Sequence, residues 1–284
     1  MSYECFDVSI TDKVAHVKLD RGPSLNTMIP SFWTELPKII NEISEEGKAR
    51  AIVISSTGKH FCAGMDLAVF TGGGLSDGEK TERGRRNALT RESALHLQES
   101  FTCFERARMP VLAAIQGGCV GGAVDMVTAA DMRYATEDAW FCIQEINIGM
   151  TADVGTLQRL PKIIPEGVAR ELAYTGRRMP AQRALEVGLV NEVFSTHELM
   201  VEAVLEIAAE IATKSTKIPT IGIGAGKNVD GQVLVLHDML GMNKEFSPRF
   251  LRRYTDLDEI ICRAITQYSK DVKSEKFPNK KEQY

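Results

Sequence analysis

Residues 111–131 read VLAAIQGGCVGGAVDMVTAAD, and this stretch decides the fold class. The run VLAAI (111–115) is short and apolar, which is typical of a buried strand. The glycines of GGCVGG (117–122) precede a helical pattern. The stretch therefore predicts a strand that passes through a glycine turn into a helix.

The same alternation of strand and helix recurs on the N-terminal side of this stretch. Strand patterns at AHVKL (15–19) and AIVIS (51–55) are interleaved with helical patterns at 31–47 and 91–108. This alternation predicts an α/β core. Between the second strand and the longer helix, the glycine-rich and charged residues 71–87 predict a surface loop.

The C-terminal third has a different pattern. After about residue 153 the strand signal is reduced to GLVNEVF (188–194), and helical patterns cover 197–215 and 256–276. We therefore expect a core of residues 1–196, which holds the site, followed by a helical C-terminal region of residues 197–284.

Composition excludes several classes of function. The net charge is −4 with acidic and basic residues interspersed, so nucleic acid is not an expected partner. The six cysteines lack a C-x-x-C pair and the five histidines lack metal-ligand spacing, so we expect reduced thiols and no metal site. No dinucleotide fingerprint is present, so no cofactor is expected.

Targeting and membrane signals are also missing from the sequence. No apolar run approaches the roughly 20 residues of a membrane span, and the N-terminus resembles neither a signal nor a transit peptide. The ending KKEQY does not match a peroxisomal S-K-L signal. We expect a soluble intracellular protein, cytoplasmic if no targeting segment is missing.

Two strand-to-helix junctions share a chemical possibility. The segment GKHFCAGMDL (58–67) and the segment GGCVGG (117–122) both place small residues before a helix start. The first N–H groups of a helix lack an intrahelical acceptor and are free to bind an anionic oxygen. Either run alone is compatible with a tight turn, but two converging donors predict an oxyanion site.

Three carboxylates accompany the second junction. Asp125 falls on the helix that Gly121 and Gly122 open, where it either faces inward or complements the helix dipole. Glu145 closes an apolar run, and Asp153 begins the pattern DVGTLQRLPKII, where it is either an N-cap or a second acid in the cavity. If the chain folds back through NIGMTA, Glu145 and Asp153 face each other and can move a proton between two carbons.

These motifs together resemble the enoyl-CoA hydratase/isomerase (crotonase) family. The resemblance covers nearly the whole chain, through VAHVKLDRGPSLNTM, ARAIVISSTGKHFCAGMDL, MPVLAAIQGGCVGGAVDMVTAADMRYATEDAWFCIQEINIGM, TLQRLPKII and RALEVGLVNEVF. It implies a spiral of ββα turns with a helical C-terminal oligomerisation region. It also implies an acyl-CoA thioester as substrate, with coenzyme A as part of that substrate, and a homotrimer or homohexamer.

The resemblance also implies roles for individual residues. The backbone N–H groups of Met65 and Gly122 match the family's oxyanion hole, which holds the thioester oxygen. The substrate is expected to contact Ala63, Gly64, Met65, Asp66, Leu67 and Gly122. Lys59 is a candidate for a phosphate contact.

Three acidic residues indicate which branch of the family the chain resembles. Hydratases of the family carry glutamates at the positions of Asp125 and Glu145 and no acid at the position of Asp153. The trio Asp125, Glu145 and Asp153 is instead similar to Δ3,5-Δ2,4-dienoyl-CoA isomerases of fatty acid β-oxidation, in which Glu145 and Asp153 would transfer the proton and Asp125 would tune the site. This resemblance adds the mitochondrion and the peroxisome as expected compartments.

Two alternatives remain. One is a 2-enoyl-CoA hydratase, in which Asp125 and Glu145 position a water molecule. The other is a non-catalytic member that binds acyl-CoA, in which Asp153 is a helix cap. The turn RGPSLNTM and the stretch LGMNKEFSPRFLRRYTDLDE (240–259) depart from the family's usual pattern.

Overall fold

The computed structural model describes residues 3–66, 82–214, 221–222, 231–244 and 251–283. It divides into two compact units, Met1–Thr216 and Lys217–Tyr284. The first unit includes the helix that follows residue 196, so this division differs from the boundary expected at residue 196. The physical reason is that the apolar face of this helix is buried against strands of the core.

A six-stranded sheet forms the centre of the first unit, in the order β1-β2-β3-β4-β6-β9. The first pair is antiparallel and the remaining neighbours are parallel. Its strands are β1 (Phe6–Thr11), β2 (Val14–Leu19), β3 (Ala51–Ser56), β4 (Val111–Ile115), β6 (Met132–Thr136) and β9 (Glu192–Phe194). The strand expected over residues 188–194 is therefore shorter than predicted, because β9 covers only Glu192–Phe194.

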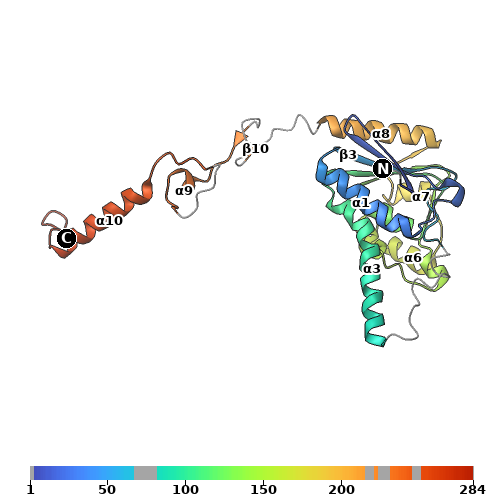
Figure 1. Ribbon diagram of the computed structural model, residues 1–284, viewed down its shortest axis with the longest axis horizontal. Helices are drawn as coiled ribbons and strands as arrows, with labels where there is room; N and C mark the ends of the chain where they lie inside the picture. The colour runs from blue at the N-terminus through green and yellow to red at the C-terminus, as the bar shows by residue number, and fades with distance from the viewer. Residues whose placement is uncertain (1–2, 67–81, 215–220, 223–230, 245–250, 284) are drawn as a thin grey trace. The chain divides into compact units, whose positions relative to one another are not determined.

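Helices cover both faces of this sheet (Figure 1). On one face lies α8 (His197–Lys214), whose Met200, Val204 and Ala208 pack against Val53 and Leu112. On the other face lie α1 (Pro30–Glu46), α3 (Arg83–Arg106) and α4 (Gly122–Ala129). Because both faces are covered, the central strands β3 and β4 are buried throughout, which explains their continuous apolar runs.

The chain alternates between this sheet and a smaller one of order β5-β7-β8. The smaller sheet contains β5 (Gly118–Val120), β7 (Trp140–Cys142) and β8 (Met179–Pro180). Thus β4 and β5 precede α4, and β6 and β7 precede η2 (Glu145–Ile148) and α5 (Thr156–Arg159). This order confirms the expected ββα turns.

The remaining elements of the first unit connect these layers. They are η1 (Gly22–Ser24), η3 (Leu160–Lys162), α6 (Glu166–Thr175) and α7 (Ala181–Glu186). The expected loop at 71–87 is partly wrong, because α3 already begins at Arg83, where Glu82 caps it by accepting hydrogen bonds from Gly84 and Arg85. Residues 71–81 lie outside the described residues.

The second unit contains short strands and helices. They are β10 (Ile221–Gly222), β11 (Gly231–Gln232), α9 (Leu236–Met239) and α10 (Leu257–Lys273). One side of α10 carries exposed apolar side chains, among them Ile261 and Ile265. Among the helices that the structure describes, none is long and apolar enough to cross a membrane.

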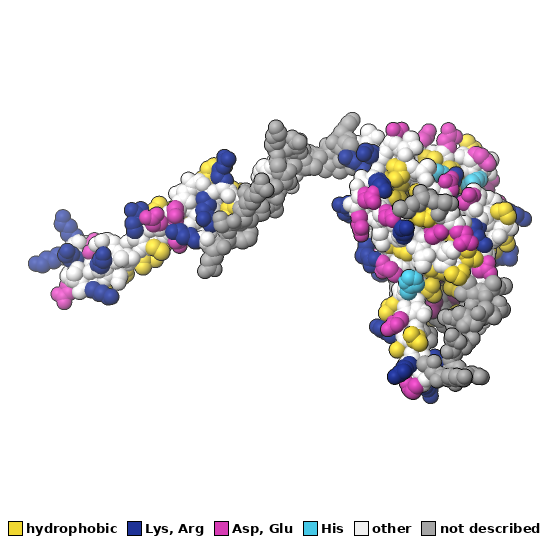
Figure 2. Space-filling model, in the orientation of Figure 1, with side chains coloured by type: hydrophobic (Ala, Val, Ile, Leu, Met, Phe, Trp, Pro, Cys, Tyr) yellow, Lys and Arg dark blue, Asp and Glu magenta, His cyan; other side chains and the backbone are white. Residues whose placement is uncertain are grey.

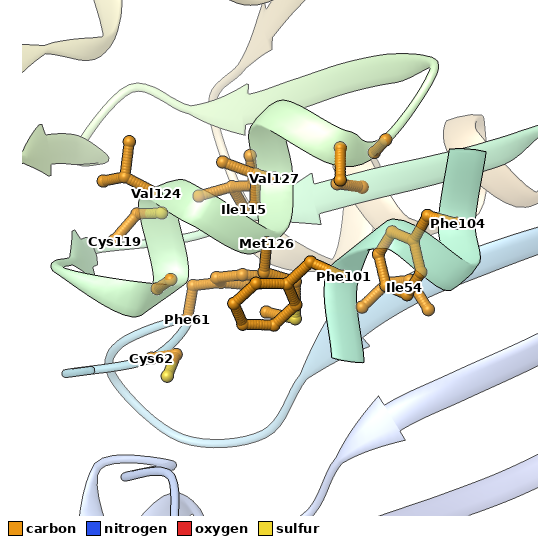
Figure 3. Packing of buried hydrophobic residues seen from close by; sticks show 14 of the residues in the cluster. Ile54, Phe61, Cys62, Phe101, Phe104, Ile115, Cys119, Val124, Met126 and Val127 are labelled. Atoms are coloured by element: carbon orange, nitrogen blue, oxygen red, sulfur yellow. The ribbon is translucent and has the colours of Figure 1, made fainter. Parts of the chain in front are cut away.

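Five of the six cysteines are buried in the first unit, and Cys262 on α10 is exposed. Burial raises the pKa of the thiols of Cys5, Cys62, Cys103, Cys119 and Cys142. Figure 3 shows Cys62 and Cys119 in the packed cluster that also contains Phe61, Phe101 and Met126. This cluster fixes the base of α4 and the loop that follows β3.

Candidate active site

Two glycine-containing junctions lie side by side in the first unit. The amide of Cys62 donates to the carbonyl of Gly118 at 3.2 Å, and the amide of Val120 donates to the carbonyl of Cys62 at 3.1 Å. A Cβ at Gly64, where φ is +85°, would lie 2.8 Å from the carbonyl oxygen of Val120. Only glycine therefore allows the two segments to approach this closely.

The backbone N–H groups of Met65 and Gly122, at these junctions, have no acceptor among the described residues. Their neighbours are held, because the amide of Asp66 donates to Met28 at 3.1 Å and the amide of Gly121 donates to Cys142 at 2.9 Å. Gly122 is the first residue of α4, where an N–H lacks an intrahelical acceptor. A Cβ at Gly64, the residue before Met65, would lie 3.7 Å from the Gly122 nitrogen, so the two N–H groups belong to neighbouring segments.

A cavity of about 610 Å³ opens beside these donors. Among the residues expected from the sequence, it is lined by Ala63, Gly64, Met65, Asp66, Gly122, Glu145 and Asp153. Asp125 and Lys59 do not line it, and Leu67 lies outside the described residues. Apolar side chains contribute most of the remaining wall. A volume and lining of this kind are typical of a small-molecule site.

Glu145 begins η2, directly after the small sheet. A Cβ at Gly121 would lie 3.1 Å from its Oε1, so the carboxyl group lies next to the glycine that precedes α4. Burial, followed by the charge of Asp125 and then that of Asp153, raises the pKa of Glu145 to about 7. Its Oε2 is buried without a hydrogen-bond partner among the described residues. This carboxyl group is able to exchange a proton near neutral pH.

Asp125 is fully buried on α4, behind the cavity wall. Its Oδ1 accepts a hydrogen bond from the backbone N–H of Thr156 at 2.6 Å, which ties α4 to the start of α5. Burial raises the pKa of Asp125 to about 6, while the contacts with Thr156 oppose the rise. The sequence left open whether this residue faces inward, and the structure shows that it does.

Asp153 is exposed and lines the cavity. Its backbone carbonyl accepts a hydrogen bond from Nε2 of Gln98 on α3 at 2.7 Å. The alternative role as a helix cap does not hold, because α5 begins at Thr156 and its N-cap residue is Gly155. The charge of Asp153 contributes to the raised pKa of Asp125 and of Glu145, so the three carboxyl groups lie near one another.

The cavity also contains residues that the sequence analysis missed. Trp33 of α1 and Trp140 of β7 both line it, and Arg178 lies over the Trp140 ring at 4.0 Å from the centroid. Further lining residues are Leu25, Thr27, Val120, Gly121, Gln144, Ile148, Met150 and Val154. One available signal was that the chain has only two tryptophans, and both face the cavity.

No group of three or more metal-ligating side chains occurs within the part of the chain that the structure describes. The chemistry that the described side chains themselves can perform is proton transfer beside two hydrogen-bond donors. Carboxyl groups of different environment are suited to such a transfer.

Comparisons with known proteins connect this geometry to one family. The family model of enoyl-CoA hydratase/isomerase matches residues 9–221. The mitochondrial Δ(3,5)-Δ(2,4)-dienoyl-CoA isomerase of Homo sapiens is 44% identical over 216 residues, which are 75% of this chain and 66% of that protein. The peroxisomal enzyme of the same name from Arabidopsis thaliana is 37% identical over 217 residues, 75% of this chain and 78% of that protein. The chain thus spans about two thirds of the human protein's length.

A solved structure agrees with this relationship. The crystal structure of an enoyl-CoA hydratase from Bacillus anthracis is 32% identical, with a TM-score of 0.65 over 74% of this chain and 77% of that chain. The similarity therefore includes the three-dimensional arrangement of the first unit's elements.

The C-terminal part has a second similarity. The family model of ketopantoate hydroxymethyltransferase matches residues 175–280. The 3-methyl-2-oxobutanoate hydroxymethyltransferase of Parabacteroides distasonis is 48% identical over 126 residues, which are 43% of this chain and 46% of that protein. Residues 240–259, which depart from the pattern of the first family, lie within this second match.

The larger match, the relatives and the fold agree with the cavity beside Met65 and Gly122, and on these grounds the chain belongs to the enoyl-CoA hydratase/isomerase family.

Proposed function

We propose that this protein is a Δ3,5-Δ2,4-dienoyl-CoA isomerase of unsaturated fatty acid β-oxidation. The observation that carries the proposal is that Glu145 and Asp153 both line the cavity that contains the Met65 and Gly122 donors. The relatives from human mitochondria and Arabidopsis peroxisomes bear the name of this activity. The substrate is an acyl-CoA thioester, and the reaction needs no cofactor because it only moves a proton.

In the proposed reaction the thioester oxygen accepts hydrogen bonds from Met65 and Gly122. Glu145 lies beside Gly121, next to this oxygen, so it removes the proton from C2. The electron pair of the broken C–H bond delocalises through the diene onto the thioester oxygen as a dienolate, which the two N–H groups stabilise. Losing one such donor costs roughly 3 kcal/mol of transition-state stabilisation.

Asp153 completes the reaction at the far end of the diene. It delivers a proton to C6, and the electrons return from the oxygen to give double bonds at C2–C3 and C4–C5. Asp153 is exposed and takes up a proton from water, and Glu145 releases the C2 proton to water, so both carboxyl groups return to their starting states. Asp125 lies behind the wall and holds the Asp153 segment through Thr156. Because one proton leaves C2 and one is added at C6, substrate and product are isomers.

The alternative is a 2-enoyl-CoA hydratase. In that reaction Asp125 and Glu145 would position water, and Asp153 would have no role. The buried position of Asp125, outside the cavity lining, supports the isomerase instead.

The deciding experiment follows the ultraviolet absorbance of the conjugated product from a 3,5-dienoyl-CoA in D₂O, beside hydration of a 2-enoyl-CoA. We expect conjugation, deuterium at C6, and a loss of at least roughly 100-fold in kcat for Glu145→Gln and for Asp153→Asn. Hydration without conjugation would replace the isomerase by the hydratase. The absence of both conjugation and hydration would favour a non-catalytic acyl-CoA-binding protein.

We also propose an assembly and a compartment. The exposed apolar side of α10 supports a homotrimer or homohexamer in which the C-terminal region is the oligomerisation region. The names of the two relatives support the mitochondrion or the peroxisome. The hydroxymethyltransferase match covers less than half of that enzyme, so the proposed activity rests on the first unit.

A further inference from the structure

We propose that Arg178, held face-on by Trp140, binds a phosphate group of the coenzyme A carrier. This inference rests on the proposed function, because it assumes a CoA thioester in the cavity. Arg178 is not a residue that the sequence pattern singled out. Its position follows from the cavity, from its stacking on Trp140 and from the distribution of charge around it.

The charge balance of the cavity supports the assignment. Its described charged side chains are Asp66, Glu145, Asp153 and Arg178, which are three acids and one base. An acyl-CoA carries several phosphate charges, so three carboxylates would repel it unless a cation received the phosphates. Arg178 is the lining cation among the described residues. A guanidinium group is well suited to phosphate oxygens, because its donors are fixed in a planar fork.

Trp140 holds Arg178 in a defined position. The guanidinium carbon lies 4.0 Å from the Trp140 ring centroid, a cation–π geometry. A Cβ at Gly118 would lie 2.9 Å from Cζ2 of this indole, so the ring packs directly on the glycine backbone. His60 contacts the ring edge-on, with 6.4 Å between centroids. The cation therefore rests on a ring that is itself fixed by packing.

Arg178 has no acidic partner within the part of the chain that the structure describes. No carboxylate among the described residues forms an ion pair with it, whereas the adjacent Arg177 pairs with Glu171 at 3.3 Å. The leading causes of the raised pKa of Glu145 are burial and the two aspartates. Arg178 is thus available to an anionic ligand, and the acid proposed to remove the C2 proton does not neutralise it.

The placement along β7 gives the cavity two distinct ends. Trp140 begins this strand opposite Gly118 of β5, and Gly122 follows the end of β5, so the Arg178 platform is displaced from the Gly122 donor by several residues at about 3.3 Å each. Trp33, Met150 and Val154 contribute apolar wall elsewhere in the cavity. The inferred orientation places the phosphates at Arg178 and the acyl chain against this apolar wall. Lys59, whose carbonyl packs on Gly117, does not line the cavity.

The test compares three carriers of the same dienoyl group: CoA, dephospho-CoA and pantetheine. For Arg178→Gln we expect KM for the CoA thioester to rise roughly tenfold, with kcat within about twofold, because one charge-assisted hydrogen-bond pair is lost. The KM for the pantetheine thioester should not change. A smaller loss with dephospho-CoA than with CoA would assign the contact to the 3′-phosphate, and an equal loss would assign it to the diphosphate.

Arg177→Gln is the matched control, since it removes the neighbouring charge outside the cavity and should leave every KM unchanged. Equal effects of Arg178→Gln on CoA and pantetheine thioesters, or no effect on either, would overturn the inference. Calorimetric titration with free CoA and with pantetheine measures the same contact without turnover. If the wild type binds CoA through Arg178 but does not isomerise the dienoyl-CoA, the proposed function fails and this inference stands.

Discussion

At the scale of single residues, the site depends on carboxyl groups whose surroundings favour the protonated form. Burial is the leading cause of the raised pKa for both Glu145 and Asp125. The charge of Asp153 raises the pKa of both acids further, and the charge of Asp125 also raises the pKa of Glu145. A folded chain that tolerates such groups loses some stability in exchange for a reactive site.

The first prediction concerns stability and pH. The pKa of Glu145 lies near 7 in the folded chain and at its ordinary value of 4.5 when exposed, so folding favours the protonated acid. Its stabilising contribution is complete below about pH 4.5 and is lost as pH rises through 7. Glu145→Gln should therefore raise the free energy of unfolding at pH 8 by about 3 kcal/mol and have little effect at pH 4. Urea unfolding at both pH values measures this, and equal effects at the two would contradict it.

The second prediction concerns catalysis and pH. As the base, Glu145 must be deprotonated, so kcat/KM should fall below about pH 7. Asp125→Asn removes a negative charge that raises the Glu145 pKa and should shift this midpoint to lower pH. Asp131→Asn is the control, because Asp131 also accepts a backbone N–H, from Val111 at 2.8 Å, but does not influence Glu145. An unchanged midpoint in Asp125→Asn would remove Asp125 from the site.

The sequence predicted part of this residue-level arrangement. Asp153 and Glu145 were expected in one cavity because both interrupt apolar runs near a glycine turn. The burial of Asp125 and the entry of Trp33 and Arg178 could not be predicted in this way. These side chains come from separate elements, and only tertiary packing determines which of them reach the cavity.

At the scale of elements, the two glycine junctions position the chemistry. Strand β5 and the segment around Cys62 are hydrogen-bonded to each other, and Gly121 then turns the chain into α4 with φ of +57°. The sequence predicted these junctions because glycine patterns are local. It did not predict where α3 begins, since residues 83–87 are polar and gave no apolar periodicity.

Gly121→Ala tests the second junction. The added Cβ would lie 3.1 Å from Oε1 of Glu145 and would be held at a positive φ, so we expect kcat to fall at least roughly tenfold through displacement of the carboxyl group. Gly188→Ala imposes a similar strain, with φ of +84° and its nearest contact at 3.9 Å from Ile163. It should lower the free energy of unfolding by about 1 kcal/mol without changing kcat. Equal kcat values for the two variants would show that Gly121 serves the turn alone.

At the scale of the whole molecule, two overlapping segments of the chain carry different similarities. The enoyl-CoA hydratase/isomerase match ends at residue 221, whereas the ketopantoate hydroxymethyltransferase match extends to residue 280. The sequence predicted a helical C-terminal region, and α10 is its longest helix in the second unit. The boundary at residue 196 stays a prediction, because a helix that packs on the core and a helix that leaves it have similar apolar patterns. Charged side chains of both signs are interspersed over the visible face of the molecule (Figure 2), as the sequence indicated.

The assembly prediction belongs to this scale. Light scattering should give a native mass of three or six times the 31.3 kDa chain. Replacing both Ile261 and Ile265, which are 40% and 61% exposed on α10, by glutamate should lower that mass. Lys270→Glu introduces the same change in charge on the opposite side of the helix and should leave the mass unchanged. A single-chain mass for the wild type would contradict the trimer and the hexamer.

The distribution of thiols has a practical consequence. A maleimide dye attacks thiolates that solvent can reach, and five of the six cysteines are buried with a raised pKa. Under native conditions the dye should attach at Cys262 alone. The wild-type chain thus offers one fluorescent reporter on α10, through which the second unit can be observed while the first unit remains unlabelled.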